Sequence, residues 1–156
     1  MKPKRRKLRE KILQTLYAFE MQGSGLSDII EDQLKEVHDK QDEDFCKNLI
    51  HNIIAERNQI EEYIEKSLVN WEFSRIAVVD KIILRIGIGE FIFSSEIPTK
   101  VTINEMIEIA KEYSTANSGK FINGILDNIL LELHNDGKVK KVGRGLLEKS
   151  ISKAEK

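Results

Sequence analysis

Apolar residues recur every three or four positions along most of this chain, which is the spacing of amphipathic helices. The first run predicts a helix over about residues 7–22, and Gly23-Ser24-Gly25 ends it. Later runs predict helices over residues 26–37, about 45–68, about 74–93, up to about 113, and about 121–135. The pattern therefore indicates an all-α fold of six or seven helices without strands.

The run from Ile76 to Ile86 is rich in β-branched residues, so a strand is the alternative to a helix there. Its charged residues do not alternate as a half-buried strand requires, and we therefore predict a helix. Gly87 and Gly89 lie near the end of this run without the lysine of a phosphate-binding loop. We interpret them, like Gly124 in the last helix, as points of close helix packing.

Two helix starts can be predicted from capping residues. Ser74 is placed to cap the helix that follows it. Thr102 and Glu105 have the spacing of a capping box, in which each side chain bonds the other's backbone N–H. Val101 and Met106 lie where a hydrophobic staple would form. These residues predict a helix that begins at about Thr102.

Composition limits the class of protein. The 156 residues are 40% hydrophobic and 33% charged, which is typical of a globular protein with a charged surface. We expect one domain over residues 1–136 and a basic, flexible tail over 137–156. No apolar stretch of about 20 residues spans a membrane, and the charged N-terminus does not resemble a signal peptide. The single cysteine, Cys46, excludes an internal disulfide and fits a reducing cytoplasm.

Charge is distributed unevenly along the chain. Residues 2–11 carry seven basic residues and one acidic residue, and residues 137–156 carry seven basic and two acidic residues. The totals of 25 basic and 26 acidic residues leave 11 basic and 23 acidic residues between residues 12 and 136. An acidic body with basic ends suggests a polyanionic partner that binds at an end.

Candidate catalytic chemistry is sparse. The three histidines share no ligand spacing, Cys46 has no activating partner, and we expect no enzyme activity, cofactor or metal. The basic arm, residues 2–11, is the better candidate, because its cations would neutralise phosphates and release counterions. A merely solubilising terminus is the alternative. Trp71 and Tyr17 are candidates for base stacking, with a core position as the alternative for each.

Four motifs, in order, resemble those of the NusB family of transcription antitermination factors, over roughly residues 1–134. The first is Arg5-Arg6-Lys7-Leu8-Arg9-Glu10 followed by Leu13-Gln14-Thr15-Leu16-Tyr17. The second is Asp80-Lys81-Ile82-Ile83-Leu84-Arg85, and the third is Pro98-Thr99-Lys100-Val101-Thr102-Ile103-Asn104-Glu105. The fourth is Lys120-Phe121-Ile122-Asn123-Gly124-Ile125-Leu126-Asp127.

The resemblance implies a compact seven-helix fold of two packed bundles. It also implies binding of the boxA element in single-stranded nascent ribosomal RNA leaders together with NusE, a small-subunit ribosomal protein. The complex would join elongating RNA polymerase with other Nus factors and suppress premature termination. The residues expected to bind RNA are Lys2, Lys4, Arg5, Arg6 and Arg9. Those expected at the NusE face or its RNA edge are Tyr17, Asp80, Asn117 and Phe121.

Two alternatives remain open at this stage. NusB-like domains also precede RNA cytosine methyltransferases, so the chain could be an accessory RNA-binding domain for an RNA-modifying enzyme. It could also form a homodimer that hides the arm until a partner arrives. The sequence departs from the family pattern at Asn117, where some members carry an acid, and in the basic tail after Gly137.

Overall fold

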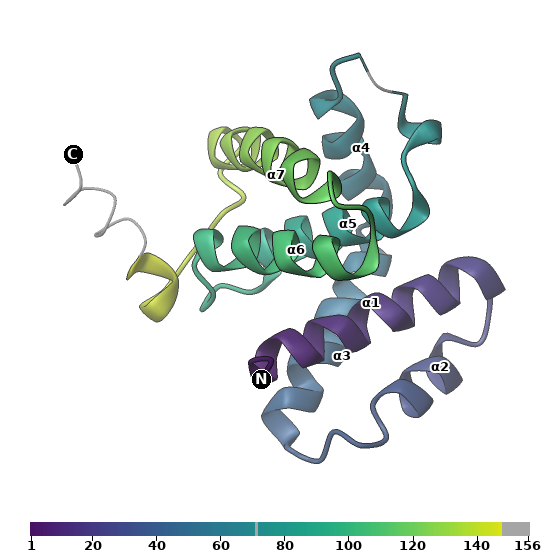
Figure 1. The fold of residues 1–156 in the computed structure, drawn as a ribbon. Helices are drawn as coiled ribbons and strands as arrows, with labels where there is room; N and C mark the ends of the chain where they lie inside the picture. Colours follow the sequence, from purple (N-terminus) through teal and green to yellow (C-terminus); the bar gives the residue numbers. More distant parts are fainter. Residues whose placement is uncertain (71, 148–156) are drawn as a thin grey trace.

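Helices make up the regular structure of this protein (Figure 1). A computed structural model describes residues 1–70 and 72–147, and this part of the chain has seven α-helices and no strand. The helices are α1 (Lys4–Gln22), α2 (Leu26–Gln33), α3 (Lys40–Ala55), α4 (Arg57–Ser67), α5 (Val78–Phe93), α6 (Thr99–Tyr113) and α7 (Ser118–Asn135). Two 3₁₀ turns are η1 (Phe73–Arg75) and η2 (Gly143–Leu146). The all-α prediction is confirmed.

The helices form two bundles around α5, as Figure 1 shows. Helices α1, α2 and α3 pack together on one side, while α4, α6 and α7 pack on the other, and α5 contacts both groups. From Ile82 to Phe91 every residue of α5 is buried. None of the helices in residues 1–70 and 72–147 is long and apolar enough to cross a membrane.

Two glycines allow neighbouring helices to approach α5 closely. A Cβ at Gly89 would lie 2.6 Å from Cγ1 of Ile53, and one at Gly87 would lie 3.0 Å from Leu126. The predicted packing role of both is therefore confirmed. The same prediction is wrong for Gly124, where a Cβ would meet nothing within 4 Å. Gly124 is exposed on α7, and no neighbouring group among the described residues requires a glycine at this position.

Several predicted helix boundaries are wrong. The long helix predicted over 45–68 is two helices that meet at Glu56, because α4 turns away to pack on α5 and α7 while the apolar spacing continues across the break. Asp39 caps α3 by accepting hydrogen bonds from the backbone N–H groups of Gln41 and Asp42. Ser74 lies in the turn η1 and caps nothing, since α5 begins at Val78.

The predicted capping box is also wrong. Helix α6 begins at Thr99, directly after Pro98, whose fixed φ suits a helix start. Thr102 therefore lies inside the helix, where its buried hydroxyl donates to Oε1 of Glu90 at 2.9 Å. Glu105 instead accepts hydrogen bonds from Arg6. Val101 is exposed while Met106 is buried, so the predicted staple does not form either.

The described part of the C-terminal tail makes specific contacts. In this C-terminal segment, residues 138–147, the Lys141 ammonium donates to the carbonyls of Glu90 at 2.9 Å and Ser94 at 2.7 Å. The Val142 N–H donates to the Ser95 carbonyl at 3.0 Å. A cation is favourable at these carbonyls because they form the negative end of the α5 dipole. The sequence predicted a flexible tail from residue 137 and did not predict these contacts. Residues 148–156 lie outside the described residues.

Burial governs the chemistry of Cys46. Burial raises the pKa of its thiol from an ordinary value of 9.0 to about 12. Because the thiolate is the reactive form, its fraction at pH 8 falls by about 1000-fold. We expect Cys46 to resist alkylation by iodoacetamide at pH 8 in the folded protein and to react fully in 6 M guanidinium. Mass spectrometry of timed samples measures this, and rapid labelling of the folded protein would contradict it.

Candidate nucleic-acid interface

The basic arm forms the first two turns of α1 rather than a free extension. Helix α1 begins at Lys4 immediately after Pro3, and its first turn contains no acidic residue. Cations at this end oppose the helix dipole, so they need anions from elsewhere. The body of the protein supplies such anions from α1 itself, α3, α5 and α6.

Arg9 is buried at the junction of the two bundles. Its Nε donates to Oε2 of Glu90 at 2.6 Å and its Nη2 donates to Oε1 at 2.9 Å. Arg9 is 2% exposed and Glu90 is 0% exposed. A bidentate pair of this kind fixes α1 against α5 and leaves the guanidinium no surface for RNA. Arg9 therefore has a structural role, and we do not include it among the residues proposed to contact RNA.

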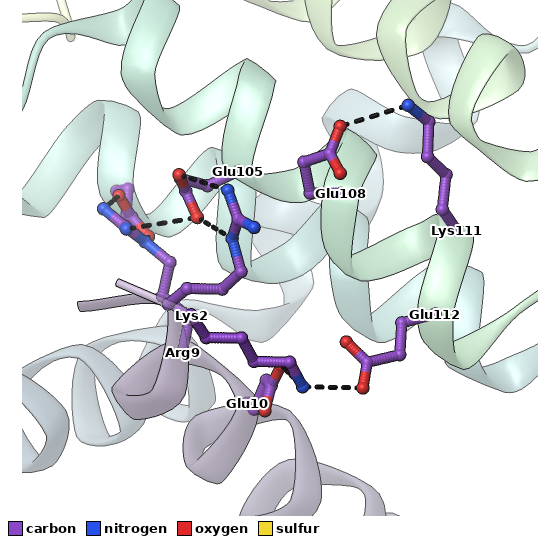
Figure 2. A network of polar contacts seen from close by, with 9 residues as sticks. Lys2, Arg9, Glu10, Glu105, Glu108, Lys111 and Glu112 are labelled. Carbon is purple, nitrogen blue, oxygen red and sulfur yellow. Dashed lines mark hydrogen bonds and ion pairs between the residues drawn. The ribbon is translucent and has the colours of Figure 1, made fainter. Parts of the chain in front are cut away.

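Lys2 lies at the edge of the same network, as Figure 2 shows. Arg6 joins this network through Glu105. Arg6 is half-buried and makes a bidentate pair with Glu105 at 2.7 and 3.0 Å. The Lys2 ammonium lies 2.7 Å from Glu10 and 2.6 Å from Glu112. These contacts raise the pKa of Lys2 above its ordinary value and lower the pKa of Glu112. Both cations are held against the body by carboxylates.

Of the remaining arm cations, Lys4, Arg5 and Lys7 are exposed, whereas Lys11 is half-buried and donates to the Gln33 carbonyl at 3.4 Å. Lys4 pairs with Asp42 at 2.6 Å, and that hydrogen bond raises the pKa of Lys4. Arg5 stacks over the ring of Phe45, with its guanidinium carbon 4.1 Å from the ring centroid. Lys7 is exposed and makes no ion pair with the described residues. Lys7 and Phe45 were missed as site residues, although Lys7 belongs to the same basic run and could have been included.

Three of the four predicted partner-binding residues line one cavity. Asp80, Asn117 and Phe121 meet where the start of α5 faces the start of α7, around a cavity of about 280 Å³. Ser118 donates to Oδ2 of Asp80 at 3.3 Å, while the buried Oδ1 has no hydrogen-bond partner among the described residues. A buried carboxylate oxygen without a partner is costly, so a donor that reached it would be favourable. This cavity, hereafter the Asp80 pocket, is thus suited to a cationic or N–H group.

One further candidate lies elsewhere. Tyr17 is on α1, 42% exposed, and does not line the Asp80 pocket. Trp71 lies outside the described residues.

The fold, the basic arm and the Asp80 pocket together define a class of protein. Its members are all-helical, have two bundles, and hold a cationic helix start against an acidic body. Residues 6–131 match the NusB family. The chain is 40% identical to the transcription antitermination protein NusB of Chloroherpeton thalassium over 92% of this chain and 69% of that protein. Identity to NusB of Salinibacter ruber is 41%, over 92% and 91% of the two chains. This chain therefore belongs to the NusB family.

Solved structures show the same fold. T. maritima NusB superposes with a TM-score of 0.77 at 40% identity, covering 85% of this chain and 94% of that one. A chain in the crystal structure of antitermination factors NusB and NusE in complex with dsRNA gives a TM-score of 0.74 at 24% identity, covering 82% and 96%. The relatives named above are antitermination proteins and not enzymes, in agreement with the sequence prediction.

Proposed function

We propose that this protein binds the boxA element of nascent ribosomal RNA leaders together with NusE, joins the elongating RNA polymerase complex and suppresses premature termination. The main support is the exposed pair of arm cations, Arg5 and Lys7, on a helix start that buried ion pairs hold in place. A relative solved with NusE and dsRNA supports the choice of partners. Acting on nascent transcripts, the protein would work in the cytoplasm.

In this proposal the arm residues have different roles. Arg5 and Lys7 contact phosphates directly, because no carboxylate among the described residues pairs with either. Lys2, Lys4 and Arg6 contribute when phosphates replace their carboxylate partners, Glu112, Asp42 and Glu105. Arg9 acts only by positioning α1. The gain from each phosphate contact depends on salt, because binding releases counterions.

Transcription through a terminator tests the proposed function directly. A template with a boxA leader is transcribed by RNA polymerase with NusE and the other Nus factors, with and without this protein. We expect added protein to increase read-through on the boxA template and not on a template with a scrambled boxA. Equal read-through with and without the protein on both templates would contradict the proposal.

The Asp80 pocket is proposed to receive a cationic or N–H group of NusE. Replacing Asp80 with asparagine removes the charge but keeps the size, and losing a buried charge partner costs about 2 kcal/mol, roughly 30-fold in affinity. We expect this weakening of NusE binding by isothermal titration calorimetry. Asp127→Asn, an exposed change on α7, is the matched control and should leave the affinity unchanged. Equal affinities of both variants would exclude the pocket as the NusE site.

A further inference from the structure

A second cavity lies beside the basic arm, and the stacked pair Arg5 and Phe45 forms part of its lining. It is lined by the first turn of α1, the middle of α3 and the connection between α5 and α6. Its volume is about 190 Å³, about six times the volume of a water molecule in the liquid. That is space for one flat ring system and not for a stacked helix. The lining residues used below are Arg5, Phe45, Asn48, Asn52, Ser95 and Glu96.

We propose that this cavity binds a single unstacked nucleobase of the RNA, and we call it the base pocket. The inference rests on the proposed function, since it assumes that RNA lies along the arm. Phe45 supplies an aromatic face and Arg5 a planar cation, and unstacked bases bind against both kinds of group. The Arg5 guanidinium covers the Phe45 ring in this structure, so the base stacks on the outer face of the guanidinium or replaces it over the ring.

The polar groups of the pocket suit a base edge. Asn48 and Asn52 are four residues apart on α3 and so share one face of the helix. Neither side-chain amide has a hydrogen-bond partner among the described residues, and an amide offers a donor and an acceptor together. Asparagine pairs with base edges in this way. The two amides therefore allow the pocket to recognise a base by hydrogen bonds to its edge, which a simple cationic surface cannot do.

The negative charge of Glu96 favours a base over a phosphate inside the pocket. Its exposed carboxylate pairs with no cation among the described residues, so the lining carries one negative charge opposite Arg5. A carboxylate repels a phosphate but accepts hydrogen bonds from the amino group of cytosine or adenine. The phosphates accordingly follow the arm outside, where Lys7 and the N–H edge of Arg5 contact them, and the base turns inward against the flat face of Arg5.

The C-terminal segment contacts the α5–α6 connection, which forms one wall of the base pocket, but does not itself line the pocket. Lys141 and Val142 hydrogen-bond to the carbonyls of Ser94 and Ser95, two of the residues by which the α5–α6 connection lines the pocket. Gly145 lies so close that a Cβ there would be 2.3 Å from the Ser95 carbonyl oxygen. The segment that continues past the last helix thus fixes the shape of the pocket.

Abasic substitution tests the base pocket. A labelled boxA RNA and a set of copies, each lacking one base, are titrated by fluorescence anisotropy against the full chain in the presence of NusE. We expect one position at which loss of the base weakens wild-type binding by about five-fold or more. In Phe45→Leu and in Asn48→Ala/Asn52→Ala this penalty should disappear, while Asn58→Ala, an exposed asparagine on α4, should keep it.

The possible failures are distinguishable. If the wild type does not bind the intact RNA, the proposed function and the base pocket are both overturned. If it binds but no abasic position is penalised, or if both pocket variants keep the full penalty, the base pocket alone is overturned. Circular dichroism shows whether each variant is folded. If Phe45→Leu does not fold, the single exposed change Asn48→Ala tests the pocket instead, and it should at least reduce the loss of affinity at the abasic position.

Discussion

Replacing Glu90 with alanine is expected to lower the free energy of unfolding by about 3–5 kcal/mol, because removing one partner leaves a buried charge without compensation. The Glu90 carboxylate accepts two hydrogen bonds from Arg9 and one from Thr102, and it is fully buried. These three contacts join α1, α5 and α6, so the loss should appear as reduced stability of the whole domain. Urea unfolding followed by circular dichroism measures it.

Two companion variants make this result specific. Glu62→Ala removes an exposed partner of Lys66 on α4 and should change stability little, because surface pairs contribute little. Arg9→Met/Glu90→Leu replaces both buried charges with apolar groups and should recover most of the lost stability. A loss for Glu90→Ala no larger than that for Glu62→Ala would contradict the structural role of the pair. Unchanged RNA binding by the recovered double variant would confirm that Arg9 makes no RNA contact.

Removing Arg5 and Lys7, the two exposed arm cations without a carboxylate partner among the described residues, is expected to have the largest effect on RNA binding. For Arg5→Ala/Lys7→Ala we expect roughly 30-fold weaker binding, from about 1 kcal/mol for each lost contact. The slope of log K against log salt should fall by about 1.4, since each phosphate contact to single-stranded RNA contributes about 0.7. Filter binding or anisotropy over a range of salt concentrations measures both quantities.

A control with the same change in net charge separates contact from general attraction. Lys35 and Lys66 are exposed lysines outside the arm, and each forms its ion pair with an acid three or four residues before it in the sequence. Lys35→Ala/Lys66→Ala should therefore leave the salt slope nearly unchanged. If the two double variants reduce the affinity and the slope equally, the arm acts through net charge alone and not through direct phosphate contacts.

Periodicity predicted the helices, but it could not predict where tertiary packing divides them. The spacing of Ile53, Ile60 and Ile64 continues through the break at Glu56, so nothing local distinguishes one helix from two. Thr102 and Glu105 have the spacing of a capping box, yet both side chains bind groups on other helices. Local capping rules fail there because partners distant in sequence compete for the same side chains.

The candidate site was predictable in part. The arm was evident from charge, but the separation of its cations into buried and exposed members depends on carboxylates up to 110 residues away. One signal was available: Arg9 shares a helix face with Leu13 and Leu16, which are buried. The meeting of Asp80, Asn117 and Phe121 was implied only by the family resemblance. Their distance in sequence leaves no local pattern to indicate it.

Competitive binding of boxA RNA in the presence of NusE tests the central claim most directly. The complex of this protein with NusE is titrated with labelled boxA RNA and with a scrambled RNA of the same length, and the protein alone is titrated in parallel. We predict tighter binding of boxA than of the scrambled RNA, further tightening by NusE, and loss of both effects in Arg5→Ala/Lys7→Ala. Equal affinity for the two RNAs, with or without NusE, would contradict the account.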